Sequence, residues 1–262
     1  MEGLFCFNRY CITSSFLYNR MLAVFKRELF SFLSSSIAYI TIGIFLLACG
    51  LMFWFFPDTS ILEYGYAEMD GFFSFVPYLF MFLISAITMR SFAEERKEGT
   101  YVLLATRPLT DLQIIVAKYL ACMVLVLFSL IPTLFYYYSI SQLGLPKRNI
   151  DSGAVIGSYI GLLLLGAAFT SIGIFASSIT KNQIIAFTIA VFLCFFAYSG
   201  FDSLSRIDTF NGIESLIINL GINEHYQSIS RGVLDTRDLV YFITFAALFL
   251  GLTKLSLGGR KW

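Results

Sequence analysis

The sequence predicts an all-α polytopic membrane protein with six transmembrane helices, and three observations lead to that prediction. Hydrophobic residues make up 58% of the 262 positions, and charged residues only 13%. The apolar residues gather in uncharged runs about as long as the roughly 20 helical residues that a bilayer core requires. These runs are apolar on all sides, whereas membrane strands alternate apolar and polar residues over about ten positions. The sequence therefore predicts helices in lipid rather than a barrel.

The first predicted element is an amphipathic helix over residues 21–33 that lies in the membrane interface. Apolar residues recur there at three- and four-residue spacing, while Lys26, Arg27 and Glu28 fill the other side. Such a helix serves either as an ordinary anchor before a membrane span or as a lever packed beside a cytoplasmic loop. Since Met21 resembles a natural start, residues 1–20 are expected to be an N-terminal extension of the domain over residues 21–262.

The six predicted spans follow in order along the chain. Five contain no charged residue, and the sixth is long enough if Lys254 and Lys261 extend toward the lipid headgroups. Pro132 is expected to kink the third span, because proline removes a backbone hydrogen bond. The spans cover residues 37–56, 72–89, 119–138, 154–179, 184–201 and 239–253.

The distribution of basic residues predicts the orientation of the spans. If the N-terminus is cytoplasmic, most of the 18 lysines and arginines fall on the cytoplasmic side. The positive-inside rule therefore predicts that both termini are cytoplasmic. The formal net charge of +1 gives no indication of a nucleic-acid partner.

One dense charged segment, residues 94–100, lies between spans two and three. Glutamates dominate its five charges, although the positive-inside rule requires only lysine and arginine. Gly99 is expected to break a helix there, and Thr110 with Asp111 is expected to cap the next one. The segment is either a solvated loop or a docking element for a partner outside the bilayer, and the apolar residues that follow it favour docking. Those apolar residues are Tyr101, Leu103 and Leu104.

Two further segments carry structural signals. Gly153, Gly157 and Gly161 recur every four residues in span four, a spacing that lets helix backbones approach closely. Packing inside the subunit is the favoured use of these glycines, and a subunit interface is the alternative. Residues 202–238, between spans five and six, are apolar in places and predict short re-entrant outer helices.

Several classes of chemistry are absent from the sequence. It contains no G-x-x-x-x-G-K-[ST] phosphate loop, no H-E-x-x-H zinc motif and no G-x-S-x-G serine motif. The lone histidine, His225, is expected to be an outer-loop residue rather than a catalytic base. The predicted spans lack Asp, Glu and His, which argues against a proton-driven carrier and leaves sodium-driven transport open. We therefore expect no catalytic residue, no metal site and no cofactor site in this chain.

Three segments together resemble a known family. They are MLAVFKREL at 21–29, EERKEGT at 94–100 and SRGVLDTRDL at 230–239. In combination with six spans, they resemble the permeases of ABC-2 type ABC transporters, and most closely the gliding-motility-associated GldF-type permeases. The resemblance covers nearly all of residues 21–262, with Ser36 standing where the family often has proline.

The resemblance implies a permease subunit of an ATP-driven exporter in a bacterial inner membrane. A separate ABC ATPase subunit would bind ATP and Mg, so that this chain would not be an enzyme. Other implied partners are the lipid bilayer and a second permease copy or a sister permease. The coupling region carried over from the family comprises Glu94, Glu95, Arg96, Glu98, Gly99, Thr100, Tyr101, Leu103 and Leu104. The alternative is a membrane anchor that docks a cytoplasmic partner without transporting anything.

Overall fold

A computed structural model describes residues 21–55, 69–100, 110–143, 151–205, 218–232 and 235–258. Within these ranges the regular elements are all helical, and six helical segments are long and apolar enough to cross a membrane. The prediction of an all-α polytopic membrane protein is thereby confirmed. The six segments are Ser36–Trp54, Asp70–Lys97, Asp111–Leu143, Ser152–Ile179, Gln183–Ser205 and Thr236–Gly258.

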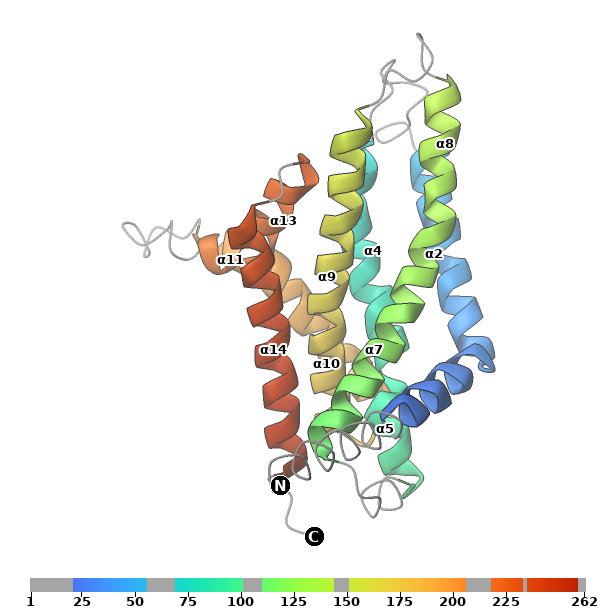
Figure 1. Cartoon of the computed structure of the whole chain (residues 1–262), viewed down its shortest axis with the longest axis vertical. Coiled ribbons are helices and arrows are strands. Elements are labelled where there is room, and N and C mark those ends of the chain that lie inside the picture. The colour runs from blue at the N-terminus through green and yellow to red at the C-terminus, as the bar shows by residue number, and fades with distance from the viewer. Residues whose placement is uncertain are drawn as a thin grey trace, which may run out of the picture.

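The helices run side by side as an elongated bundle, with a further helix over residues 21–33 crossing its lower end (Figure 1). Span two is divided into two helices, and spans three and five each change helix type partway along. The labelled elements are α2 (Ser36–Trp54), α4 (Asp70–Thr88), α5 (Arg90–Lys97), α7 (Asp111–Leu130), η1 (Ile131–Thr133), α8 (Leu134–Leu143), α9 (Ser152–Ile179), α10 (Gln183–Phe195), η2 (Phe196–Gly200), α11 (Phe201–Ser205), α13 (Ile222–Ser230) and α14 (Thr236–Gly258).

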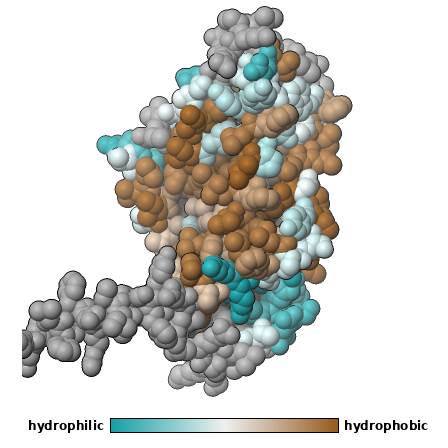
Figure 2. Space-filling model, turned by 45° about the vertical axis from the view of Figure 1, so that its right-hand side comes forward, coloured by the Kyte–Doolittle hydropathy of each residue, from teal (hydrophilic) through white to brown (hydrophobic). Residues whose placement is uncertain are grey.

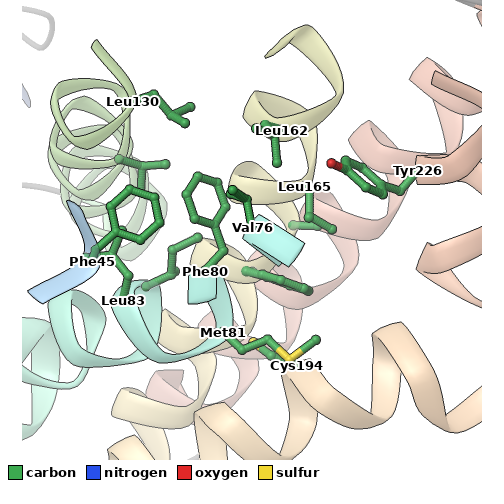
Figure 3. Packing of buried hydrophobic residues seen from close by; sticks show 14 of the residues in the cluster. Phe45, Val76, Phe80, Met81, Leu83, Leu130, Leu162, Leu165, Cys194 and Tyr226 are labelled. Atoms are coloured by element: carbon green, nitrogen blue, oxygen red, sulfur yellow. The ribbon is translucent and has the colours of Figure 1, made fainter. Parts of the chain in front are cut away.

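Helix α9 is the centre of the bundle. It packs against α4, α5, α7, α10, α13 and α14. In its apolar stretch of 18 residues, 72% is buried inside the protein, compared with 17% in the corresponding stretch of α14. Figure 3 shows Phe80 of α4 lying between Phe45 of α2 and Leu162 of α9. The rings of Phe45 and Phe80 lie 5.5 Å apart. The core is thus an apolar layer shared by α2, α4, α7 and α9.

The outer surface of the bundle is apolar as well. Large side chains such as Ile184, Phe192 and Leu255 are well exposed, and Figure 2 shows a broad hydrophobic region on the visible face, with hydrophilic residues gathered toward its ends. An exposed apolar surface of this extent would be a liability in water. Here it suits contact with lipid tails, as expected for a membrane protein.

Local sequence signals account for several helix ends. Thr110 accepts a hydrogen bond from the Gln113 amide and forms a capping box, as predicted, so that α7 begins at Asp111. Pro132 lies in the 3-10 turn η1, where the third span departs from α-helical geometry, and the expected kink stays a prediction. Asn182 caps α10 through the Ile184 amide and closes the hairpin between spans four and five.

Short helices lie between spans five and six, as predicted, at the end of the bundle opposite α5 (Figure 1). Helix α13 packs against α9 and α14. A Cβ at Gly161 would lie 2.9 Å from Ile229, and one at Gly157 would lie 3.0 Å from the Gly232 backbone. These two glycines therefore serve close packing inside the subunit. Gly153 lies instead beside the Asp151 side chain, which caps α9.

Helices α4 and α9 approach each other closely at Gly173. A Cβ there would lie 2.0 Å from Thr88 Oγ1 and 2.8 Å from Thr88 Cβ. We expect Gly173→Ala to push the two helices apart and to lower the free energy of unfolding by about 1–3 kcal/mol. Thermal unfolding of the purified chain measures the effect.

Gly251→Ala is the matched control, because no atom lies within 4 Å of a Cβ at Gly251. If Gly173→Ala and the control unfold at the same temperature, the close approach of α4 and α9 at Gly173 is contradicted.

Candidate functional site

The charged segment continues span two instead of forming a separate loop helix. Helix α4 ends at Thr88, and α5 begins two residues later at Arg90. Glu94 and Glu95 therefore lie in the second half of α5. Gly99 has a φ of 73°, the left-handed conformation that favours glycine after a helix end, so the predicted break is confirmed.

The apolar part of the predicted coupling region cannot be placed. Tyr101, Leu103 and Leu104 lie outside the described residues.

The junction between α4 and α5 is held by a serine from α9. Ser177 Oγ accepts hydrogen bonds from the amides of Phe92 (3.0 Å) and Ala93 (3.1 Å) and donates one to the Met89 carbonyl (3.0 Å). One hydroxyl group thus serves as the N-terminal cap of α5 from a distant part of the chain.

Arg96 ties the far half of α5 to the same helix. Its guanidinium group donates a hydrogen bond to the Ser178 carbonyl at the end of α9. With Ser177 at the start of α5 and Arg96 near its end, both halves of α5 are oriented by α9.

Four side chains form a closed ring of alternating charge between the helix over residues 21–33, α5 and α7. Arg27 contacts Glu28 at 2.5 Å and Glu95 at 2.6 Å, while Lys118 Nζ lies 3.2 Å from Glu28 and 3.1 Å from Glu95. We call these four residues the charge ring. Two positive and two negative groups make its formal charge zero. The Arg27–Glu95 ion pair of the ring joins the helix over residues 21–33 to the charged segment.

The two cations of the charge ring differ in exposure. The Lys118 side chain is 1% exposed and that of Arg27 is 46% exposed. Burial lowers the pKa of the Arg27 guanidinium, but hydrogen bonds and charges from Glu28 and Glu95 outweigh burial and raise this pKa above its usual value. The ring is therefore closed toward the protein interior and open at Arg27.

The sequence placed Glu28 on the polar side of the amphipathic helix together with Lys26 and Arg27, and for Glu28 that placement is wrong. Glu28 is 7% exposed and points inward, whereas Phe30 is 69% exposed. Its carboxylate is buried because Lys118 supplies a countercharge inside the protein. Lys26 is exposed, as expected.

Glu94 makes a separate contact. Arg90 holds both of its carboxylate oxygens, each at 2.9 Å, and also donates to Ser35 between the helix over residues 21–33 and α2. The Arg90–Glu94 pair therefore links α5 to the chain entering span one.

The remaining part of the charged segment faces outward. Lys97, Glu98, Gly99 and Thr100 are all exposed at the end of α5. Glu94, Glu95 and Arg96 are only partly exposed and contact the rest of the protein. The segment thus divides into an inner part that fixes α5 and an outer part, residues 97–100, which we call the α5 tip.

Sequence reasoning missed Lys118 and Ser177. The apolar run beginning at Tyr119 set the predicted start of span three and left Lys118 outside it. The Thr110 capping signal indicates that Lys118 belongs to this helix, because a helix that begins at Asp111 includes Lys118 two turns after its start. No local signal marks Ser177, since its partners lie more than 80 residues away in the chain.

His225 lies on helix α13 rather than in a loop. Its Nδ1 lies 2.7 Å from Asp238 Oδ1 and its Nε2 lies 3.0 Å from the Asn219 carbonyl, while its ring stacks on Tyr241 at 3.9 Å. These contacts join α13 to the first turns of α14. Among the described residues, no group of three or more His, Cys, Asp or Glu side chains is placed to hold a metal ion.

Comparison with known proteins gives one family. Residues 59–259 match the family model described as ABC-2 family transporter protein. The comparison with curated proteins gives no match. The matched region runs from before span two to the end of span six and includes α5, Lys118 and Ser177.

The Ser177 cap predicts a measurable local effect. We expect Ser177→Ala to remove the hydrogen bonds to Phe92, Ala93 and Met89 and to lower the free energy of unfolding by about 1–2 kcal/mol. An increase in amide hydrogen exchange that is larger in α5, residues 90–97, than in α4 would report the loss.

Ser171→Ala is the control on the same helix, because the Ser171 hydroxyl bonds only to the Ala168 carbonyl of α9 itself. Equal exchange in residues 90–97 for both variants would show that Ser177 does not cap α5.

Proposed function

The chain belongs to the ABC-2 family of transporter proteins, and from this premise we propose that it is the membrane-spanning permease subunit of an ATP-driven exporter. In this proposal α5 receives the movement of a separate ABC ATPase subunit and passes it to the spans. The exposed α5 tip, at the end of a helix that continues span two, is the observation that carries the proposal.

The surroundings of the tip support a role in force transmission. A short exposed helix end offers a surface for docking, and its inner half is braced by Ser177, Arg96 and the charge ring. Movement of the tip would therefore reach α9, α7 and the helix over residues 21–33 together. A solvated loop without such contacts would absorb the same movement by bending.

ATP chemistry is assigned to the partner in this proposal. A phosphate loop supplies the backbone amides and the lysine that hold nucleotide phosphates, and the sequence contains none. ATP and Mg would be bound by the ATPase subunit, and this chain would supply the membrane pathway.

The proposed location is a bacterial inner membrane with both termini cytoplasmic. The distribution of lysine and arginine supports this orientation. Helix α5, the helix over residues 21–33 and the C-terminal end of α14 lie at the same end of the bundle (Figure 1), and Ser256 of α14 hydrogen-bonds to the Ser178 carbonyl at 3.4 Å. This common end would face the cytoplasm.

The assembly and the biological setting are also part of the proposal. The permease would pair with a second copy or with a sister permease, and the resemblance to GldF-type permeases suggests a gliding-motility-associated system. The alternative function is a membrane anchor that docks a cytoplasmic partner without transport. Stimulated ATP hydrolysis distinguishes the two, because an anchor would bind a partner without changing its ATPase rate.

The test is purification of the tagged full-length chain from its native membrane, followed by identification of bound proteins and measurement of ATP hydrolysis. We expect an ABC ATPase to copurify and to hydrolyse ATP faster in the complex. The charge-exchanged tip variant K97E/E98K should reduce the copurified ATPase about fivefold or more, because like charges at a docking surface oppose binding.

Glu224→Lys is the control, since Glu224 is an exposed acidic residue on α13 at the opposite end of the bundle. Membrane insertion of each variant is checked by its yield in the membrane fraction. A tip variant that copurifies as much ATPase as the control would refute docking at the α5 tip.

A further inference from the structure

Lys118 lies at the centre of the charge ring, and the family match assigns no role to this residue. We propose that Lys118 is a positioning residue that makes the helix over residues 21–33 and α5 move as one lever on span three. This inference rests on the proposed function, since it describes how the permease would receive the movement of its ATPase.

Lys118 is the point where the two helices meet the bundle. Its ammonium group donates a hydrogen bond to the Ser91 carbonyl at 2.7 Å and forms ion pairs with Glu95 Oε2 at 3.1 Å and Glu28 Oε2 at 3.2 Å. Two of these oxygen atoms belong to α5 and one to the helix over residues 21–33. The ammonium also lies 5.0 Å from the centre of the Phe92 ring of α5.

The burial of Lys118 makes these contacts hard to break one at a time. If α5 moved without the other helix, Lys118 would lose its contacts with Ser91 and Glu95, and Glu95 would lose both of its ring partners. An ionised group that is buried without its partner is strongly unfavourable. The low-energy movement therefore keeps Glu28, Glu95 and Lys118 together.

Arg27 has a different role in the same ring. It contacts both carboxylates but is 46% exposed, so water can replace its partners when it moves away. Loss of Arg27 leaves both carboxylates paired with Lys118. Loss of Lys118 leaves them facing each other with one half-exposed cation.

Stability alone does not explain a ring of four charges in which Glu28, Glu95 and Lys118 are largely buried. Replacing a buried ion cluster by apolar residues of similar size is often neutral or stabilising, because the desolvation of the charges offsets their attraction. Apolar side chains would hold these helices together but would permit sliding. Ion pairs with defined geometry fix one relative position of the two helices.

The experiment distinguishes the effect of the charge ring on the relative position of the two helices from its effect on stability. It uses three variants of the full-length chain, each purified with the ATPase that the wild type retains. Lys118→Met leaves the carboxylates of Glu28 and Glu95 without their buried cation and should lower the unfolding temperature by about 10 °C. The triple variant E28Q/E95Q/K118M removes the stranded charges and should unfold within about 3 °C of the wild type. Lys254→Met is the control, since Lys254 is an exposed lysine on α14.

The expected result is a triple variant that is stable and still binds the ATPase but has lost coupling. Stimulation of ATP hydrolysis should fall about tenfold, within the range of allosteric coupling effects. Amides of residues 21–33 should exchange about tenfold faster than in the wild type, while those of α9 should be unchanged. Lys118→Arg, which keeps the cation, should recover part of the stimulation.

Each other outcome overturns a stated claim. Stimulation within twofold of the wild type in the triple variant would overturn the role of Lys118 and leave the permease function standing. Loss of ATPase binding in that variant would show that the ring maintains the docking surface instead. A wild-type chain that retains no ATPase would overturn the proposed function and this inference together.

Arg27→Gln keeps the test decisive if the triple variant does not fold. It opens the ring only on its exposed side, so stimulation should stay within about twofold of the wild type. A tenfold loss in this variant would assign the coupling to Arg27 and refute the role of Lys118.

Discussion

The contact on which the architecture depends is the crossing of α4 and α5 over α9. Gly173 lets α4 approach until Thr88 occupies the space that a Cβ would need. One turn later, Ser177 hydrogen-bonds to the amides of Phe92 and Ala93 and to the Met89 carbonyl, where α4 gives way to α5. The two residues therefore fix both the distance and the direction of α5.

The charged segment combines two physically different tasks. Its inner residues make ion pairs and hydrogen bonds with three other helices, while residues 97–100 are exposed. Exposed charges remain free to meet a partner, and partly buried pairs hold the helix in place. The placement of α5 at the end of span two means that a force on the tip acts along a helix already packed in the core.

The opposite end of the bundle uses packing and hydrogen bonds instead of a charge ring. Helix α13 reaches α9 through Gly157 and Gly161, and Tyr226 donates a hydrogen bond to the Phe73 carbonyl at 2.7 Å. His225 and Asp238 then join α13 to α14. The short outer helices are thus held to three spans without contributing a full span of their own.

The sequence by itself determined the fold class, the approximate spans and several helix ends. Runs of apolar residues determine which segments enter lipid, and local signals such as Thr110 and Gly99 set helix ends through their own backbone neighbours. Only the tertiary structure decided that Glu28 points inward, that Lys118 lies at the centre of the charge ring and that Ser177 caps α5. Whether a charge can be buried depends on a countercharge from another helix, and that partner becomes known only when the chain is folded.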